Sequence, residues 1–364
     1  MKVAITHPYS WPEVRRGAER IIVETARSLA GRGHDVTIIS AGRSAGRSVE
    51  EGVRVHRVRR HFEDGVRHER WFGWRIIPLL VAGRYDVVHS FMPPDAVAAI
   101  RTRRLAGHRA LYDEMGIPVR EWWPGQPHFR NRLRIAKDVD VYACMSQFAV
   151  DALERTSRRR GAVLPGGVRL TEFQPPPARD PRPTLLFSGA VDEPRKGVAM
   201  LLDALAVVAE QEPGVQLWLS GPGDAEALLA AAPNAARERT TVLPLGEPSD
   251  QARRYGQAWA TVLPSVNESF GMVLIESLAC GTPLVVADQS APPEQVTADT
   301  GSLCVPGDAG SLAEAILRTL DLARRPGTVA ACRAHASQYD WDAAIAPLLE
   351  DLYTRELGTP AASV

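Results

Sequence analysis

Residues 264–283 read PSVNESFGMVLIESLACGTP, and this stretch decides what fold and function the chain is expected to have. Two acids, Glu268 and Glu276, stand around a Phe270-Gly271 turn, and an apolar run follows the turn. A helix that begins near Gly271 would direct its free backbone N–H groups and the positive end of its dipole toward the turn. Such a helix end is a binding site for a phosphate group.

The two acids add hydrogen-bond acceptors to this phosphate site. Glu268 at the turn can accept bonds from hydroxyl groups, and each bond to a charged group contributes about 1.5–3 kcal/mol. Glu276, about two helical turns further on, can reach a second hydroxylated group such as a ribose. A phosphate site flanked by two hydroxyl acceptors is typical of a protein that binds a nucleotide-sugar.

The composition is that of a soluble globular protein large enough for two domains. The chain has 364 residues, of which 45% are hydrophobic and 24% charged. Met1-Lys2 leads directly into a strand pattern without a leader peptide, and no apolar run approaches the roughly 18–20 residues of a membrane span. The four cysteines and nine histidines show no paired or metal-ligand spacing. We therefore expect a cytoplasmic protein with reduced thiols and no metal.

The two halves of the chain carry opposite net charges. Residues 1–182 hold 32 basic and 20 acidic side chains, a net charge of +12, and residues 183–364 hold 11 and 23, a net charge of −12. The basic half could attract an anionic acceptor or the inner face of a membrane, and the basic aromatic segment 54–75 prompts the second idea. The simpler alternative is that opposite charges help two domains face each other. No nucleic-acid partner is expected.

Strands and helices alternate along both halves, which predicts parallel sheets with helices on both faces. Strands are expected at 3–7, 35–40, 53–57, 86–91, 109–114, 140–146, 184–188, 215–220, 241–245, 260–263 and 284–287. A proline cluster that begins at residue 175 is the expected linker, because proline is excluded from helix interiors and central strands. The predicted fold class is α/β, with two Rossmann-like doubly wound domains facing across a cleft. The expected domains are 1–172 and 173–341, with a C-terminal helix 342–356 that packs back on the first.

Glycines and cations at strand ends extend the predicted site. Gly17 opens a helix after the first strand, where a glycine lets the backbone approach a phosphate. In the loop 189–197, Arg195 and Lys196 could neutralise a diphosphate, and the alternative is a solvated loop with two surface cations. Gly221 and Gly246 lie in turns at further strand ends and could hold a base, although tight turns use glycine in any case.

Two other patterns can also be explained by a purely structural role. Asp138-Val139-Asp140 resembles a metal-binding pair of acids, but its place at the start of an apolar strand favours a structural role. Trp122 and Trp123 could stack on a sugar or cover a lipid, and core packing explains them equally well.

Taken together, these segments resemble the retaining GT-B glycosyltransferases of glycosyltransferase family four, and the resemblance spans nearly the whole chain. The segment 264–283 is its most specific part. The remaining matches are GAER at 17–20, RGHDVT at 32–37, VLPGGV at 163–168 with Phe173, EPRKG at 193–197, Pro293-Glu294, and the segment from Thr300-Gly301 to Pro306-Gly307-Asp308.

The resemblance implies an enzyme of the hexosyltransferase type. It would move a sugar from a nucleoside-diphosphate sugar to a natural product, an envelope glycan or a glycolipid, with retained anomeric configuration and without a metal or cofactor. By the family pattern, Glu268 and the backbone at Phe270-Gly271 hold the donor sugar, while Glu276 holds the ribose. Lys196 and Gly17 face the diphosphate, whose departure is the main electrostatic task of the reaction.

The candidate site residues fall into three groups. Those expected in catalysis are Glu268, Lys196 and Arg195. Those expected to bind the donor are Arg16, Gly17, Gly189, Gly221, Gly246, Phe270, Gly271, Met272, Val273 and Glu276, where the backbone N–H groups of Met272 and Val273 hold phosphate. Those expected on the acceptor side are Tyr9, Trp11 and Glu114.

Three positions depart from the family pattern. Ala190 stands where an arginine is common, Met115-Gly116 where a His-Gly pair is common, and Arg16 where the first glycine of a pair is usual. A diphosphate would then depend on Lys196 and Arg195. These departures leave a second hypothesis open, a catalytically weak or inactive protein that binds a nucleotide-sugar or a glycan.

Overall fold

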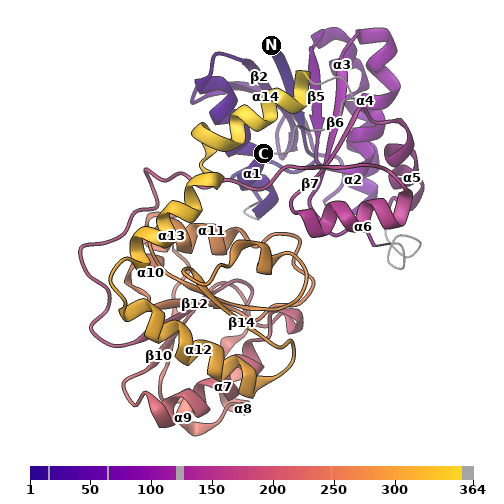
Figure 1. Ribbon diagram of the computed structural model, residues 1–364. Coiled ribbons are helices and arrows are strands. Elements are labelled where there is room, and N and C mark those ends of the chain that lie inside the picture. The colour runs from indigo at the N-terminus through magenta and orange to yellow at the C-terminus, as the bar shows by residue number, and fades with distance from the viewer. Residues whose placement is uncertain (15–16, 64, 120–126, 247, 355–364) are drawn as a thin grey trace. The chain divides into compact units, whose positions relative to one another are not determined.

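The computed structural model describes residues 1–364 apart from 15–16, 64, 120–126, 247 and 355–364, and it divides into two compact units (Figure 1). The first unit comprises Met1–Gly167 together with Trp341–Val364, and the second unit is Val168–Asp340. Each unit has a sheet of its own.

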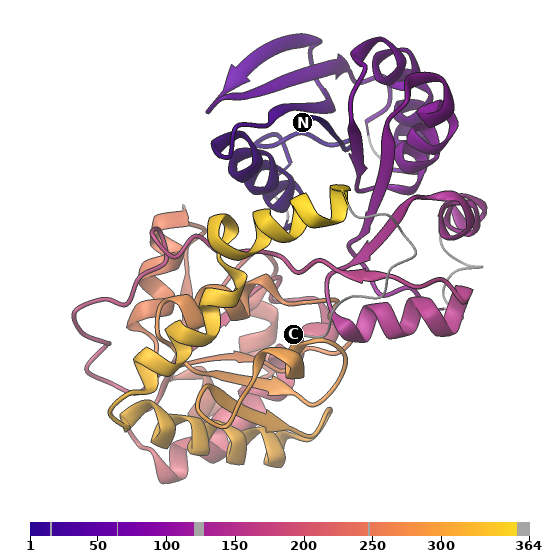
Figure 2. The same ribbon diagram turned by 45° about the horizontal axis from the view of Figure 1, so that its top comes forward.

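The first unit is built on an eight-stranded sheet in the order β3-β4-β2-β1-β5-β6-β7-β8. Its neighbouring strands are parallel except β3 and β4, which form an antiparallel hairpin at the edge (Figure 2). The order reverses between β1 and β5, as in a doubly wound sheet. The strands are β1 Lys2–Thr6, β2 Asp35–Gly42, β3 Gly46–Glu50, β4 Val53–Arg59, β5 Val87–Ser90, β6 Arg109–Glu114, β7 Val141–Cys144 and β8 Ala162–Val163.

Helices cover both faces of this sheet. Alternate residues of a strand point to opposite faces. In β5, Val88 accordingly joins the core beneath α2, α3 and α4, while His89 bonds the Tyr353 hydroxyl of α14. The helices are α1 Gly17–Gly31, α2 Val66–Arg75, α3 Ile77–Gly83, α4 Pro93–Ala106, α5 Phe129–Asp138, α6 Gln147–Ser157 and α14 Ala346–Thr354, the last preceded by a π-helical turn, η4 Trp341–Ile345.

The C-terminal segment is anchored to the first unit by polar contacts. Ser28 Oγ donates to Asp342 Oδ1 at 2.7 Å, and Arg32 forms a two-pronged ion pair with Glu350 at 2.8 and 2.9 Å. His89 Nδ1 lies 2.9 Å from the Tyr353 hydroxyl, and complete burial lowers the pKa of His89 to about 3. The imidazole is therefore neutral, because burial disfavours its charged form.

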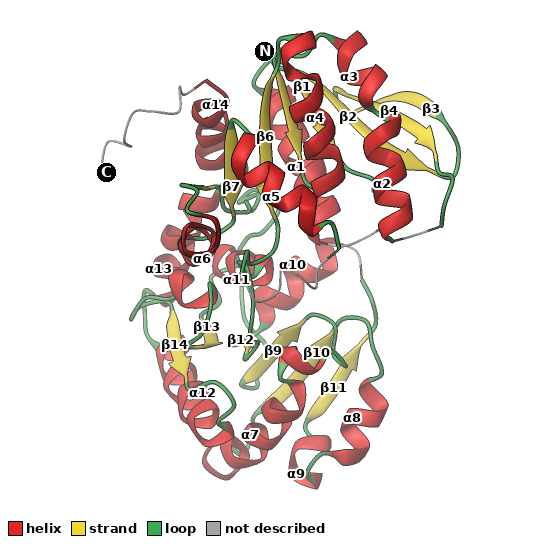
Figure 3. Cartoon of the chain, turned by 90° about the vertical axis from the view of Figure 1, so that its right-hand side faces the viewer, coloured by secondary structure: helices red, strands yellow, loops and turns green. Residues whose placement is uncertain are grey.

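The second unit has a six-stranded, entirely parallel sheet in the order β11-β10-β9-β12-β13-β14. Figure 3 shows α7 and α12 on one face and α10 and α11 on the other. The strands are β9 Thr184–Ser188, β10 Gln216–Ser220, β11 Thr240–Leu243, β12 Ala260–Leu263, β13 Leu284–Ala287 and β14 Gly301–Cys304. The helices are α7 Val198–Gln211, α8 Ala225–Ala231, α9 Asn234–Arg237, α10 Pro248–Gln257, α11 Met272–Ala279, α12 Ala309–Arg324 and α13 Thr328–Ala336, with 3-10 turns η1 Pro194–Lys196, η2 Pro292–Gln295 and η3 Ser337–Tyr339.

The boundary between the units lies earlier than the expected residue 172. Val168 N–H donates to Tyr339 O at 2.8 Å, and Arg333 donates to Leu170 O at 2.9 Å, so residues 168–172 belong to the second unit. The proline cluster is not the linker either. Asp180 N–H donates to Gln257 O at 2.9 Å, which ties this segment to α10 inside the second unit.

A carboxyl group of the first unit is buried without a full set of partners. Asp113, near the end of β6, is 3% exposed, and its Oδ1 has no hydrogen-bond partner. Burial, together with the neighbouring Glu114, raises the pKa of Asp113 to about 8. The folded protein therefore holds a proton on this side chain at neutral pH.

We predict that Asp113→Asn stabilises the protein, and increasingly so as the pH rises from 5 to 8. The unfolded chain loses this proton near pH 4, whereas the folded protein keeps it up to about pH 8. The stability that the protonated carboxyl contributes is thus complete below pH 4 and is lost as the pH rises toward 8. The amide has no such loss, so its advantage grows by at most about 1.4 kcal/mol per pH unit.

Urea unfolding of the wild type and the variant at pH 5, 6, 7 and 8 measures this difference. Glu154→Gln, at an exposed position of α6, is the matched control and should show a small difference that changes little with pH. A difference for Asp113→Asn that is equally independent of pH would contradict the assigned protonation state.

Candidate functional site

The candidate site of the second unit lies where the order of its sheet reverses. The reversal falls between β9 and β12, and ligands of doubly wound proteins bind outside the carboxyl ends of the strands at this point. Two loops leave these strand ends, residues 189–197 after β9 and residues 264–271 after β12. Val266 N–H donates to Arg195 O at 2.9 Å, so the backbones of the two loops are joined.

The predicted catalytic residues meet between these loops. The carboxylate of Glu268 contacts Lys196 Nζ and accepts a bond from Arg195 Nη1 at 2.9 Å. The side chains of Glu268 and Lys196 are only 11% and 14% exposed, whereas that of Arg195 is 38% exposed. Burial opposes the charge of Arg195, but the carboxylates of Glu268 and Glu193 outweigh it and raise the pKa of Arg195. Two cations and the carboxylate of Glu268, which is expected to bind the sugar, therefore lie together in one partly buried location.

The backbone of Glu268 is held in place on its other side. Its N–H donates to Ser290 Oγ at 3.1 Å, and its carbonyl oxygen accepts from Ala291 N–H at 3.3 Å. Ser290 follows β13, the next strand of the sheet. Glu268 is therefore held by the loops that follow three neighbouring strands, β9, β12 and β13. The sequence pattern did not reveal this arrangement.

The N-terminus of α11 is open, as the sequence predicts. Gly271 adopts φ +94° at the N-cap, and no side chain caps the helix. The first backbone N–H groups, those of Met272 and Val273, have no carbonyl partner inside the helix, because a helix leaves its first turn of donors unpaired. They are available to an anion at the positive end of the helix dipole.

Two candidate residues near this helix end, Phe270 and Glu276, are buried. Phe270 is 4% exposed, its ring lies edge-on to Tyr339, and its carbonyl accepts from Gln295 Nε2 at 2.6 Å. Glu276 is 3% exposed on the second turn of α11. Burial, together with the Glu276 carboxylate, holds the pKa of Tyr255 well above its usual value.

The predicted glycines let loops approach each other closely. A Cβ on Gly221, which has φ +150°, would stand 1.8 Å from Gly189 O, so the loops after β9 and β10 are in direct backbone contact. A Cβ on Gly246 would stand 2.8 Å from Asp250 Cβ. The close approach of these turns to neighbouring backbone and side chains accounts for their composition, whether or not they also meet a base.

A polar cluster at the same edge was not foreseen from the sequence. Arg254 on α10 is 7% exposed and donates to Ser220 Oγ at 2.9 Å and to Pro244 O at 2.7 Å. Gln251, one turn earlier, donates to Ser188 Oγ at 2.7 Å. These contacts tie α10 to the ends of β9 and β10. In the sequence they are ordinary polar residues of an amphipathic helix, a pattern with no functional signal.

The acceptor-side candidates lie in the first unit, and two of them are occupied by other contacts. Tyr9 is buried, and its hydroxyl donates to Glu69 Oε1 at 3.1 Å. Glu114, at the end of β6, is buried in an ion pair with Arg132. The hydroxyls of Tyr112 and Tyr142 also donate to Glu114, each at 3.2 Å.

The remaining first-unit candidates are more accessible or are not described. Trp11 is half-buried, and Gly17 is the exposed first residue of α1. Arg16, Trp122 and Trp123 lie outside the described residues. Asp140 accepts from Arg103 Nη1 at 2.8 Å and from Ala110 N–H at 2.8 Å, which supports the structural interpretation of the Asp138-Val139-Asp140 segment.

The described part of the chain has neither a metal-binding cluster nor a membrane-spanning helix. It contains no group of three or more histidine, cysteine, aspartate or glutamate side chains arranged to hold a metal ion. Among the same residues, no helix has both the length and the apolar character needed to cross a membrane.

Comparisons with known proteins agree with this geometry. A family model described as "Glycosyltransferase Family 4" matches residues 15–172, and one described as "Glycosyl transferases group 1" matches residues 182–321. A phosphatidyl-myo-inositol mannosyltransferase of Mycobacterium leprae is 29% identical over 369 residues, which cover 94% of this chain and 93% of the relative. The corresponding enzyme of Mycolicibacterium smegmatis is 27% identical, with 96% of this chain and 92% of the relative covered.

Solved structures show the same fold. A sucrose-phosphate synthase from Thermosynechococcus elongatus superposes with a TM-score of 0.82 at 21% identity, with 97% of this chain and 98% of the other covered. The HepE protein of Anabaena, in complex with UDP and glucose, superposes with a TM-score of 0.75 at 18% identity, with 98% and 100% covered. Since both halves of the chain match the family and the fold recurs in its solved structures, this protein belongs to glycosyltransferase family 4 and is a glycosyltransferase with the GT-B fold.

Proposed function

We propose that this enzyme transfers a sugar from a nucleoside-diphosphate sugar to a hydroxyl group of its acceptor, with retention of the anomeric configuration and without a metal ion. The observation that carries the proposal is the contact of Glu268 with Lys196 and Arg195 between two loops at the sheet reversal. This contact places the charges that such a reaction needs in one partly buried location.

The cations and the open helix end are suited to a diphosphate. Backbone N–H groups of Met272 and Val273 bind the phosphate nearest α11, and the charges of Lys196 and Arg195 neutralise the rest. When the bond between the anomeric carbon and the diphosphate oxygen breaks, the oxygen keeps both electrons. Cations already in position stabilise that developing charge without reorganisation.

Glu268 then has two roles in succession. Before the donor binds, its carboxylate holds Lys196 and Arg195 together. When the diphosphate takes over those cations, the carboxylate accepts hydrogen bonds from hydroxyl groups of the sugar. Glu276, on the second turn of α11, is the proposed acceptor for the ribose hydroxyls.

The relatives suggest what the donor and acceptor are. HepE is named in complex with UDP and glucose, and the mycobacterial relatives are named as mannosyltransferases that act on phosphatidyl-myo-inositol. We therefore propose a hexose donor and a hydroxylated acceptor, which is a sugar or a lipid-linked polyol. A lipid-linked acceptor would bring the enzyme to the cytoplasmic face of a membrane.

The alternative of an inactive binding protein is not favoured. It rested on Ala190, where the family often has an arginine, and on Met115-Gly116, where a His-Gly pair is common. Lys196 and Arg195 supply two positive charges at the loop that contains Ala190. The relatives that match nearly the whole chain are also named as transferases.

We predict that Glu268→Gln lowers kcat/KM by about 100-fold or more, since loss of one preorganised polar group typically costs this much. The amide keeps the size of the side chain but cannot hold Lys196 and Arg195 by charge. The measurement is initial-rate kinetics with the best donor found in a screen of nucleoside-diphosphate hexoses. Glu238→Gln, at an exposed position in the same unit, is the matched control and should leave the rate unchanged. Near-normal transfer by Glu268→Gln would defeat the proposed role.

A second prediction concerns the metal and the stereochemistry. With excess EDTA the rate should remain within about twofold of the untreated enzyme, because the proposed diphosphate partners are backbone N–H groups and the cations Lys196 and Arg195. Proton NMR of the product should show the same anomeric configuration as the donor. A large loss of rate that Mg²⁺ or Mn²⁺ restores, or an inverted product, would each overturn the corresponding part of the proposal.

A further inference from the structure

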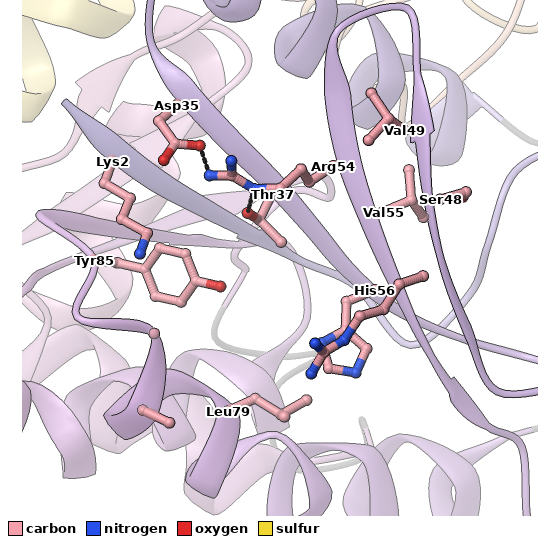
Figure 4. Close-up of a pocket in the computed structure, with 13 residues that line it drawn as sticks. Lys2, Asp35, Thr37, Ser48, Val49, Arg54, Val55, His56, Leu79 and Tyr85 are labelled. Atoms are coloured by element: carbon pink, nitrogen blue, oxygen red, sulfur yellow. Dashed lines mark hydrogen bonds and ion pairs between the residues drawn. The ribbon is translucent and has the colours of Figure 1, made fainter.

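The first unit contains a pocket of about 630 Å³ whose lining includes none of the candidate residues for sugar transfer. Its floor is the edge of the sheet formed by β1, β2, β4 and β3, and its wall includes Leu79 of α3 and the following Tyr85 (Figure 4). Pockets that bind small molecules have volumes of roughly 300–1,000 Å³, so this one can hold a compact ligand.

The pocket lies toward the amino ends of the central strands of this sheet. Lys2 and Asp35 are the first residues of β1 and β2 and face each other in the register. The loops expected to meet the donor leave the carboxyl ends of the strands. In a five-residue strand such as β1, the amino and carboxyl ends lie about 16 Å apart.

Positive charge dominates the lining. The cations are Lys2, Arg47 and Arg54, and the lining has one carboxylate, that of Asp35. Asp35 forms an ion pair with Arg54, as Figure 4 shows, and Arg54 Nε also donates to Thr37 Oγ1 at 3.4 Å. The charges of Lys2 and Arg47 are not balanced by a carboxylate of the pocket, so the site carries a net charge of about +2.

The two unbalanced cations mark opposite ends of the pocket. Lys2 lies on β1 and Arg47 on β3, and the strand order β3-β4-β2-β1 places three strand spacings between them. At about 4.8 Å per spacing, their backbones are separated by at least about 14 Å across the sheet. The two side chains enter the pocket from separate strands, so a ligand with two anionic groups can pair one group with each cation.

Hydrogen-bonding groups on a rigid support lie between these ends. Figure 4 shows the Tyr85 hydroxyl directed into the space between Thr37, His56 and Leu79. The ring of Tyr85 is held against the backbone of Gly83, where an added Cβ would stand 2.1 Å from it. Lys2 Nζ lies 5.4 Å from the centre of the same ring, which is a cation–π contact.

The polar groups of this central part suit a hydroxylated ligand. Thr37, His56 and Tyr85 can each accept or donate hydrogen bonds to hydroxyl groups. Burial, reinforced by Arg47, lowers the pKa of His56, so the imidazole is neutral and the positive charge stays with the lysine and arginines. The apolar face of Leu79 can cover the carbon face of a sugar or polyol.

We propose that this pocket is a second ligand site, separate from the site of sugar transfer, and that it binds a small sugar or polyol carrying two phosphate groups. One phosphate binds at Lys2 and the other at Arg47, and the hydroxyl groups between them contact Tyr85, Thr37 and His56. The proposal does not depend on which donor or acceptor the enzyme uses.

The test is calorimetric titration of the full-length protein with fructose 1,6-bisphosphate and, separately, with fructose 6-phosphate. The bisphosphate should bind at least about tenfold more tightly, since its second phosphate adds a charge-assisted contact. Lys2→Gln and Arg47→Gln should each remove this preference. Two variants should retain it: Arg104→Gln, which removes an exposed charge on α4, and Lys196→Gln, which removes a cation of the proposed donor site.

Two results would overturn the proposal. One is equal binding of the two sugars by the wild type, including no binding of either. The other is a preference that survives Lys2→Gln and Arg47→Gln but disappears in Lys196→Gln, which would place the bisphosphate in the donor site. Circular dichroism of each variant shows that it is folded, so a lost preference reports on the pocket itself.

Discussion

The organisation of the second unit depends on one ionic contact, that of Glu268 with Lys196 and Arg195. A carboxylate so little exposed is costly unless it is paired, and here two neighbouring strands each supply part of the pair. Because the cations come from the loop after β9 and the acid from the loop after β12, the contact fixes both loops relative to α11. The open end of that helix, the glycine turns and the cations then converge on one edge of the sheet.

Much of the fold could be predicted from the sequence because most strands of both sheets are parallel and buried. Strands such as β9 and β13 are short apolar runs followed by turns, a strong signal for this class. The hairpin strand β3 gave no such signal, since its residues GRSVE are polar and mostly exposed. The unit boundary was also missed, because the bond from Val168 to Tyr339 joins residues far apart in the sequence.

Part of the site could be predicted because its residues stand close together in the sequence, in loops at the ends of strands. Glu268, Lys196 and the turn at Gly271 stand out because their types and spacing suit phosphate and hydroxyl groups. Arg254 and Arg132 did not stand out, since each is one of several cations on a polar helix in a chain rich in arginine. Their importance comes from burial and from partners on other elements, which one sequence does not record.

The chain passes between the two units at residues 167–168 and again at 340–341, so the first unit is made of two separate pieces of sequence. Val168 and Asp340 pair in a short bridge, and a Cβ on Gly167 would stand 2.5 Å from the Trp341 ring. During synthesis the N-terminal piece leaves the ribosome long before α14, the partner of His89. The second unit, which is continuous, can therefore finish folding first, which reverses the usual N-to-C order of domain maturation.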